Sequence, residues 1–320
     1  MLAPMVKVRV LTAHDVAGLL DPVALRTALE EAMDGLSAGR AQVPPRVAAQ
    51  TPQGWLGAMP GYIEGVGLAA KLVTVFAGNT DVPSHQGLIA LFDEATGTPL
   101  SIMDAEVITE RRTAGTAAIA ADLLARPDAE VLTIVGAGAQ AAGHAMAFAP
   151  LRPWREVRVV NRSQPAAVVV AGRARAAGLE NVEVFADFEP AVTGADLVAL
   201  CTHADEGVID AGWVGTGTHV SSVGSAAELP AELARADVVV VEWRDAVTTP
   251  PPAGAAELQS LGRDDVIELG DLIAERSAGR TSPQQVTVYK STGHAVQDVA
   301  AARLVHDAAV AADVGTEIEL

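Results

Sequence analysis

The strongest chemical pattern in the chain is a glycine-containing segment that follows an apolar run. Residues 131–141 read VLTIVGAGAQA, in which Gly136, Gly138 and Ala141 form the pattern G-x-G-x-x-A. The first glycine permits a tight turn, the second lets the backbone approach a pyrophosphate, and the alanine permits close packing of helix on strand. The N–H groups of a helix that begins here face the anion. The pattern predicts a dinucleotide-binding loop, and the alternative is a strand–turn–helix corner without a ligand.

The next apolar run ends in residues that distinguish the two nicotinamide dinucleotides. Sites that prefer NAD(H) usually place Asp or Glu here to bind a ribose hydroxyl, whereas this chain has Asn161, Arg162 and Ser163. The Arg162 guanidinium suits a 2′-phosphate, and its two neighbours can add hydrogen bonds. We therefore expect NADP(H) as the cofactor in preference to NAD(H). The alternative is that Arg162 is a solvated loop arginine.

Alternating strand and helix patterns surround this loop. Strand-like runs occur at residues 131–135, 157–160, 182–185, 196–202, 219–223, 238–243 and 286–290, and helical patterns at 139–149, 165–177 and 230–236. Such alternation predicts βαβ units and a doubly wound parallel sheet of the Rossmann type. An alanine-rich helix at 106–126, ended by Pro127, leads into this region, and a last helix is expected at 296–312.

The first hundred residues have a different pattern. Residues 21–37 begin with Asp-Pro and carry apolar residues at helical spacing, and strand-like runs follow at 55–59, 68–76, 87–93 and 99–103. Gly, Pro and Asn separate these runs, which is typical of antiparallel hairpins. This part of the chain is therefore expected to form an α+β domain.

Composition excludes several classes of protein. The 320 residues carry 22 Lys and Arg against 40 Asp and Glu, a net charge of −18, whereas nucleic-acid binding needs a basic surface. The one cysteine, Cys201, cannot form an intramolecular disulfide, which fits a reducing cytoplasm. We see neither a signal peptide nor an apolar stretch that would cross a membrane, and the histidines lack metal-ligand spacing. We therefore expect a cytoplasmic protein without nucleic-acid or membrane partners and without a catalytic metal.

Seven segments, taken together, resemble the ornithine cyclodeaminase/μ-crystallin family. They are VPPRV (43–47), GLAAKLVTVF (67–76), PSHQGLIALFDEATGTPLSIMD (83–104), ITERRTAGTAAIAADLLAR (108–126), VGAGAQA (135–141), NRS (161–163) and KSTGHAVQDVA (290–300). The resemblance implies a homodimer that acts on α-amino or α-imino acids with a nicotinamide cofactor. It also implies that residues 1–120 and 296–320 form a discontinuous substrate-binding and dimerisation domain around an inserted Rossmann domain, residues 121–295.

The resemblance assigns three residues to the substrate pocket. Arg46 and Arg112 look like the arginines that hold a substrate carboxylate, and Lys71 looks like the active-site lysine. The chemistry agrees, because guanidinium groups bind carboxylates in bidentate fashion and a desolvated lysine can exchange a proton near neutral pH. Lys71 is one of only three lysines and lies in an apolar run. The alternatives are a solvated edge-strand lysine and surface ion pairs for the arginines.

Further site residues complete the expected set. His85 is a second acid/base candidate because histidine titrates near neutrality, although a structural role is equally consistent with its position. The residues expected to bind the cofactor are Thr113, Gly136, Gly138, Ala139, Gln140, Asn161, Arg162, Ser163, Thr202, Val223, Ser291 and Gly293. His294 departs from the apolar residue that the family pattern has there, and either substrate choice or simple packing would explain it.

One departure argues against ornithine cyclisation. By resemblance, cyclodeaminases carry an Asp where this chain has Ala226, and alanine cannot bind an ammonium group. The alternative is that Glu228, two positions on, replaces this Asp. The first hypothesis is therefore an NADPH-dependent reductase of α-imino acids that yields α-amino acids. The alternatives are an alanine dehydrogenase-like enzyme, ornithine cyclodeaminase-type deamination, and a non-catalytic NADPH-binding protein of μ-crystallin type.

Overall fold

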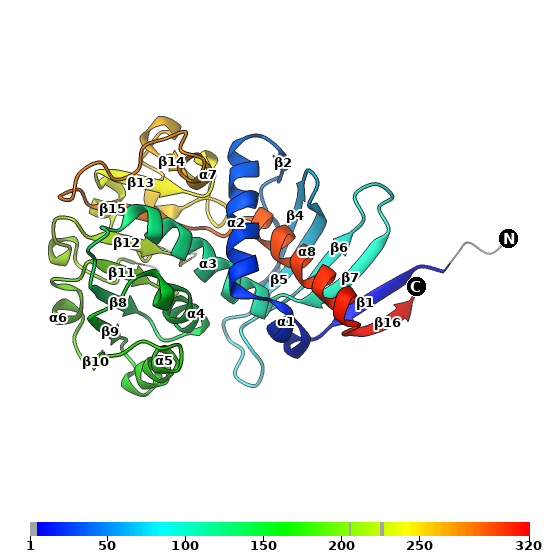
Figure 1. Cartoon of the computed structure of the whole chain (residues 1–320), viewed down its shortest axis with the longest axis horizontal. Coiled ribbons are helices and arrows are strands. Elements are labelled where there is room, and N and C mark those ends of the chain that lie inside the picture. The colour runs from blue at the N-terminus through cyan, green and yellow to red at the C-terminus, as the bar shows by residue number, and fades with distance from the viewer. Residues whose placement is uncertain (1–4, 205, 225–226) are drawn as a thin grey trace. The chain divides into compact units, whose positions relative to one another are not determined.

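The computed structural model describes residues 5–204, 206–224 and 227–320, and the chain divides into two compact units (Figure 1). The discontinuous unit comprises Met1–Arg112 and His294–Leu320, and the inserted unit comprises Thr113–Gly293. Each unit has its own eight-stranded sheet. Within the described residues, no helix combines the length and apolarity that a membrane crossing requires.

The sheet of the discontinuous unit is mostly antiparallel. Its strands follow the order β16 (Thr316–Glu319), β1 (Lys7–Leu11), β7 (Pro99–Asp104), β6 (His85–Phe92), β5 (Gly67–Val75), β4 (Trp55–Ile63) and β2 (Ala41–Gln42), with β3 (Val47–Gln50) also paired to β4. Only β1 and β7 run parallel. The predicted hairpin is confirmed, because β6 and β7 pair antiparallel around the 93–98 turn.

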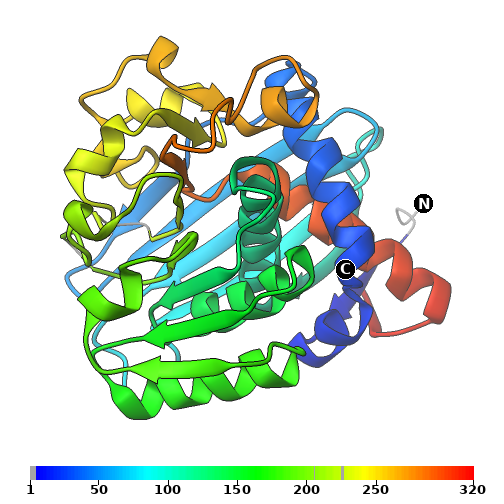
Figure 2. The ribbon, with the colours of Figure 1, turned by 60° about the vertical axis from the view of Figure 1, so that its left-hand side comes forward.

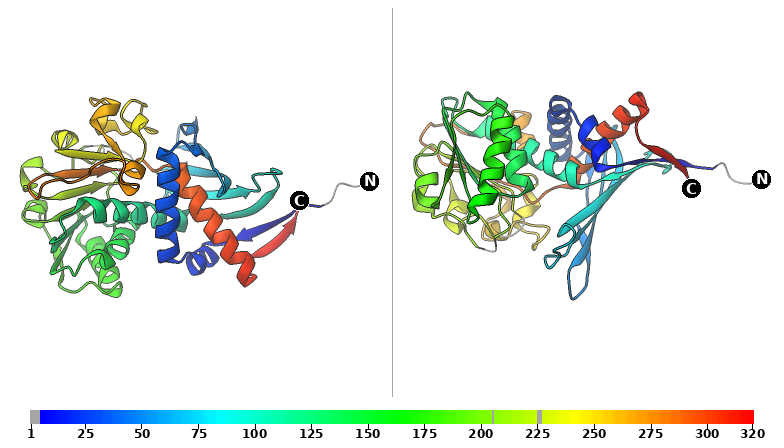
Figure 3. Two further views of the ribbon diagram at one scale, coloured as in Figure 1. Left: turned by 45° about the horizontal axis from the view of Figure 1, so that its top comes forward. Right: turned by 90° about the horizontal axis from the view of Figure 1, so that it is seen from below.

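Three helices cover one face of this sheet: α1 (Ala13–Leu19), α2 (Pro22–Ser37) and α8 (Ala295–Ala312) (Figure 3). The α2 helix begins where Asp21 accepts a hydrogen bond from the Ala24 N–H, as its Asp-Pro start predicts. Helix α8 packs on β4 to β7 and on α2, and its buried residues include Val296 and Val299. Because side chains alternate along a strand, Ala69 and Lys71 of β5 point to this covered face.

Among the described residues of this unit, no helix covers the opposite face of the same sheet, and that face is apolar. Leu72 pairs in register with Ala58 on β4 and Leu88 on β6, and Leu56 lies diagonally from it. The three leucines remain 44% (Leu56), 37% (Leu72) and 39% (Leu88) exposed. We call the surface formed by these four residues the apolar sheet face; leucines at three neighbouring positions of an exposed sheet are typical of an interaction surface.

The inserted unit contains a wholly parallel sheet, which confirms the predicted doubly wound α/β fold. The strand order is β10 (Val182–Phe185), β9 (Glu156–Val160), β8 (Val131–Val135), β11 (Leu197–Leu200), β12 (His219–Ser222), β15 (Thr287–Lys290), β13 (Val238–Val241) and β14 (Ile267–Glu268). The chain moves outward from β8 to β10 and then continues from β11 on the other side. The order therefore reverses between β8 and β11, the point where such folds bind ligands.

Helices cover both faces of the parallel sheet. Helices α4 (Ala139–Phe148) and α5 (Gln164–Ala176) pack together on β8 and β9 (Figure 2). Helix α6 (Phe188–Val192) shares the core of the other face with Val131, Val135 and Val198. Helix α7 (Leu269–Ile273) follows β14. Residues 230–236, expected to be helical, form the short 3-10 helix Ala231–Arg235 after Pro230.

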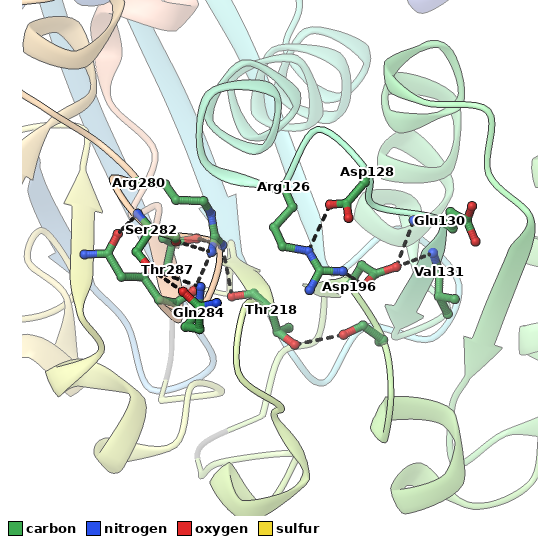
Figure 4. A network of polar contacts seen from close by, with 12 residues as sticks. Arg126, Asp128, Glu130, Val131, Asp196, Thr218, Arg280, Ser282, Gln284 and Thr287 are labelled. Carbon is green, nitrogen blue, oxygen red and sulfur yellow. Dashed lines mark hydrogen bonds and ion pairs between the residues drawn. The ribbon is translucent and has the colours of Figure 1, made fainter.

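Polar contacts tie helix α3 (Glu106–Leu124) to the edge where the parallel strands begin (Figure 4). Asp196 accepts hydrogen bonds from the N–H groups of Glu130 and Val131 and pairs with Arg126 at 2.5 Å. Arg280 donates to the Leu124 carbonyl at the end of α3 and to the Thr287 hydroxyl at the start of β15. These contacts satisfy the helix C-terminus and anchor one edge of the sheet.

Candidate active site

The predicted phosphate loop lies between β8 and α4, at the edge where the parallel strands end. Gly136 has φ +128°, and a Cβ there would lie 2.5 Å from the Cys201 carbonyl oxygen, so only glycine fits. Gly138 is the N-cap of α4, and no atom lies within 4 Å of a Cβ built on it. Ala139 and Gln140 begin the helix. The loop therefore combines a turn that requires glycine with open space beside a helix N-terminus, as a bound pyrophosphate needs.

The predicted selectivity residues follow the neighbouring strand β9 at the same edge. Asn161 donates to the Ser163 carbonyl at 3.3 Å, and Ser163 is the N-cap of α5. Arg162 is exposed. Since β8 and β9 are adjacent and parallel, the exposed guanidinium belongs to the half of the sheet that holds the adenosine part of a dinucleotide in this fold.

A buried carboxylate organises the ends of β11 and β12. Glu228 accepts hydrogen bonds from the Thr202 N–H and hydroxyl, both at 2.7 Å. Its other oxygen accepts from the Ser222 hydroxyl and from the N–H groups of Val223 and Gly224, at 2.6–3.0 Å. Thr202 and Val223, both expected to bind cofactor, are thus held by one side chain. Both carboxylate oxygens of Glu228 are thus occupied by hydrogen bonds from its own chain. Ala226, where cyclodeaminases carry an Asp by resemblance, lies outside the described residues.

A second buried carboxylate, Glu242, holds the loop after β15. It accepts from the Ser291 hydroxyl at 2.7 Å and from the N–H groups of Thr292 and Gly293 at 2.8 and 3.1 Å. Ser291 and Gly293 were predicted to contact the cofactor. Thr113, also predicted, is buried on α3 as the first residue of the inserted unit. Apart from Thr113, the predicted cofactor residues all lie just beyond strand ends at one edge of the sheet.

In the discontinuous unit, two predicted substrate residues share a carboxylate that the sequence pattern did not single out. Lys71 Nζ lies 3.0 and 2.9 Å from the two oxygens of Asp298 on α8. Arg112 Nε donates to Asp298 at 3.0 Å, and its Nη1 donates to Gln297. Lys71 and Arg112 are each 3% exposed and Asp298 is 1% exposed. Strand β5, helix α3 and helix α8 thus bring together charges that are distant in sequence.

The surroundings of Lys71 favour its neutral form. Burial and the Arg112 charge lower its pKa from 10.5 to about 8, with Asp298 opposing this and Arg46 adding to it. Burial alone would raise the pKa of Asp298, but the adjacent Arg112 and Lys71 hold it below its ordinary value. Near neutral pH the cluster therefore contains an ionised carboxylate between two cations, one of which can release its proton under mild conditions.

The other predicted residues of this unit lie differently. Arg46 is half-buried between β2 and β3, close enough for its charge to affect Lys71. His85 is exposed at the start of β6, opposite Val75, four residues along β5 from Lys71 or roughly 13 Å at strand spacing. Its Nδ1 lies 3.1 Å from the Ser84 hydroxyl. His85 is therefore not beside the Lys71 amine.

Two residues beside the predicted ones are explained by the fold. Arg111 points away from Arg112 and donates to the Ala17 and Leu20 carbonyls at the end of α1. His294 is buried as the N-cap residue of α8 and begins the second segment of the discontinuous unit.

The sequence around Asp298 has the same feature as the sequence around Lys71, a charged residue within an apolar run. It stands in the apolar run AVQDVAAA of a predicted helix, as Lys71 stands in an apolar strand. Charged residues are almost never fully buried unless they are paired, so each implied a partner. The pairing itself joins positions 227 residues apart and required the fold. Among the described residues, no group of three or more His, Cys, Asp and Glu side chains is arranged to hold a metal ion.

We expect Asp298→Asn to lower the free energy of unfolding by about 3 kcal/mol at pH 7, because two buried cations lose their counter-charge. The difference in unfolding free energy between the variant and the wild type should become smaller as the pH rises toward 8. Without the Asp298 charge, Lys71 of the folded variant loses its proton at a lower pH than in the wild type, where its pKa is about 8. Between these two pH values only the variant gains stability, because only in the variant does the unfolded chain then hold one proton more than the folded protein. Urea unfolding at several pH values measures both effects.

Asp307→Asn is the matched control, because Asp307 lies on the same helix in an exposed pair with Arg303. It should change the stability by less than about 0.5 kcal/mol. Equal stability of the two variants would contradict the role given to Asp298.

Comparisons with known proteins show which family the chain belongs to. The family model described as "Ornithine cyclodeaminase/mu-crystallin family" matches residues 6–313. The ketimine reductase mu-crystallin of Mus musculus is 38% identical over 262 residues, covering 80% of this chain and 80% of that protein. The structure of Thermococcus litoralis Δ1-pyrroline-2-carboxylate reductase in complex with NADH and L-proline is similar with a TM-score of 0.91 and 28% identity, over 97% of this chain and 100% of that one.

An archaeal alanine dehydrogenase, described as a dimer with bound NAD, has a TM-score of 0.88 and 30% identity, over 98% of this chain and 99% of that one. The similarity to these proteins thus extends over both compact units, and the family match includes the phosphate loop as well as Lys71, Arg112 and Asp298. The chain belongs to the ornithine cyclodeaminase/mu-crystallin family.

Proposed function

We propose that this protein is an NADPH-dependent reductase of α-imino acids, which it converts to α-amino acids. The observation that carries the proposal is the buried cluster in which Lys71 and Arg112 share Asp298, with the Lys71 pKa lowered to about 8. The relatives named ketimine reductase and Δ1-pyrroline-2-carboxylate reductase support it. The phosphate loop of the inserted unit supports a dinucleotide cofactor.

Each residue of the cluster has a role in the proposed reaction. Arg46 and Arg112 bind the substrate carboxylate, since guanidinium groups donate paired hydrogen bonds to carboxylate oxygens. The Lys71 ammonium donates a proton to the imine nitrogen, which makes the imine carbon more electrophilic. Asp298 fixes the position of both cations and keeps Lys71 protonated at neutral pH. The bound cofactor supplies hydride, and the rest of the work is positioning.

The same residues allow the reverse reaction. In amino-acid oxidation neutral Lys71 takes a proton from the amine, so the two directions need opposite protonation states of one group. His85 remains the second acid/base candidate, and its exposed position on β6 gives it no direct link to Lys71. Ornithine cyclisation remains disfavoured, because the carboxylate of Glu228 is occupied by donors from its own chain.

A panel of cyclic ketimines, including pyrroline-2-carboxylate, tests this function. We expect NADPH oxidation, followed at 340 nm, and a Lys71→Ala variant whose kcat falls at least about 100-fold while its affinity for NADPH is unchanged. The wild-type rate of imine reduction should fall as the pH rises through about 8, where Lys71 loses its proton.

Lys7→Ala is the matched control, since Lys7 is an exposed lysine paired with Glu317. Full activity of Lys71→Ala would refute the acid/base role. Ammonia-dependent oxidation of NADPH with pyruvate, and no turnover of any imine, would favour the alanine dehydrogenase-like alternative. Tight NADPH binding without any turnover would favour the binding protein.

The cofactor preference rests on Arg162. We expect Arg162→Ala to weaken NADPH binding about 10-fold or more and to leave NADH binding within about 2-fold, because the guanidinium pairs with the 2′-phosphate that only NADPH carries. Titration of cofactor fluorescence measures both affinities. Arg173→Ala, at an exposed arginine of α5, is the control. Wild-type protein that binds NADH more tightly than NADPH would overturn this assignment. Two similar structures are described with NADH or NAD, so the affinity of the wild-type protein must be measured for both cofactors.

We further propose that the protein is a homodimer in which two copies of the apolar sheet face pack together. The face is made of Leu56, Ala58, Leu72 and Leu88, and a two-fold axis lets one apolar surface cover its own copy. The related alanine dehydrogenase is described as a dimer.

The buried free Cys201 fits the expected cytoplasmic location.

Leu72→Arg should convert the dimer to a monomer, because it places a charge at the centre of the apolar sheet face. Light scattering during gel filtration gives the mass. Val23→Arg is the control, since Val23 is an apolar residue of α2 that is 76% exposed. A Leu72→Arg protein that keeps twice the chain mass would exclude this interface.

A further inference from the structure

A buried charged cluster lies at the edge of the parallel sheet where β11, β12 and β15 end. Lys290, the last residue of β15, donates to the Ser222 hydroxyl at 3.1 Å and the Gly224 carbonyl at 2.7 Å, and pairs with Glu257 at 2.9 Å. Ser222 in turn donates to Glu228 at 3.0 Å. Glu228 and Lys290 are at most 1% exposed. The cluster thus contains two carboxylates and one ammonium group.

Both oxygens of Glu228 accept hydrogen bonds, which is the arrangement that suits a carboxylate. Five donors surround its two oxygens: the Thr202 N–H and hydroxyl, the Ser222 hydroxyl, and the N–H groups of Val223 and Gly224. A proton on either oxygen would face a donor and displace it. Glu257 neutralises Lys290 directly, so the cluster as a whole carries one negative charge.

The fold indicates which half of the dinucleotide lies near this negative charge. The phosphate loop lies after β8 and the selectivity residues after β9, so the adenosine half occupies that side of the sheet. Dinucleotides extend across the switch point between β8 and β11, which leaves the nicotinamide half for the ends of β11, β12 and β15. The residues of the charged cluster lie at these strand ends.

The nicotinamide ring changes its charge when it reacts. It is a cation in NADP⁺ and neutral in NADPH, so a buried negative charge nearby stabilises the oxidised form more than the reduced form. The positive charge that develops on the ring as hydride leaves is stabilised in the same way. The cluster therefore affects both binding and the direction of hydride transfer.

We propose that Glu228, within the cluster it forms with Lys290 and Glu257, sets the preference of the nicotinamide site for the oxidised cofactor and favours hydride departure from NADPH. The inference rests on the proposed function, because it requires a nicotinamide dinucleotide. Glu228 acts through the field of its charge and through the loop that it holds, and these two effects can be separated.

The test measures the dissociation constants of NADP⁺ and NADPH for the full-length protein. We expect Glu228→Gln to raise the ratio of the NADP⁺ dissociation constant to the NADPH dissociation constant by roughly 5- to 30-fold relative to wild type, because it removes one buried unit charge at an effective dielectric constant of about 20–40. Lys290→Met removes a positive charge from the same cluster and should shift the ratio in the opposite direction.

Ser222→Ala separates charge from loop geometry, because it removes the hydrogen bond from Ser222 to Glu228 and the one from Lys290 to Ser222 without changing the charge of the cluster. This variant should raise the dissociation constants of NADP⁺ and NADPH by the same factor. Glu130→Gln, at an exposed residue beside the start of β8, should change neither constant.

The outcomes distinguish this inference from the proposed function. A ratio that shifts in opposite directions in Glu228→Gln and Lys290→Met supports the inference. An unchanged ratio in both, with intact wild-type binding, overturns it and leaves the proposed function in place. Wild-type protein that binds neither NADP⁺ nor NADPH overturns both.

Discussion

The pairing of one buried carboxylate with two buried cations is the constraint on which the discontinuous unit depends. Asp298 contacts both Lys71 and Arg112, and all three side chains are nearly inaccessible to water. Buried charges are tolerated only when they are paired and hydrogen-bonded, so none of the three can be placed without the others. The pairing requires that α8, from the end of the chain, returns to pack on strands formed within its first hundred residues. The covered face of the sheet is thus defined by charge as well as by apolar packing.

The inserted unit uses buried charge in a different way. Its two buried carboxylates, Glu228 and Glu242, accept hydrogen bonds mainly from backbone N–H groups and hydroxyls at the ends of β11, β12 and β15. Loops at strand ends would otherwise leave these donors without partners in a buried setting. Each carboxylate therefore orders a loop that the proposed function uses for the cofactor. In the proposed function, the arginines and the lysine of one unit bind the substrate carboxylate, and the glycine loop and ordered amides of the other bind the dinucleotide.

Local patterns predicted much of the fold, because they depend on neighbouring residues. The helix at 21–37, the strand at 131–135 and the glycine loop each follow from periodicity, caps or backbone freedom, and the structure confirms them. The pairing of β1 with β16 was not predicted, since these short strands lie at opposite ends of the chain and stabilise each other only after folding. The role of Asp298 was missed for the same reason: its partners come from two other elements. Family resemblance supplied Lys71, Arg46 and Arg112, whereas the contact that Lys71 and Arg112 share with Asp298 required the fold.

The proposed chemistry depends most on Lys71 being a buried amine whose pKa lies well below that of a free lysine. Because the chain has only three lysines, NMR spectra of protein with ¹³C-labelled lysine side chains can resolve each Cε resonance during a pH titration. The lowered pKa predicts that the Lys71 resonance, assigned with a Lys71→Ala variant, titrates at about pH 8. A Lys71 resonance that remains that of the charged form up to pH 10 would contradict it.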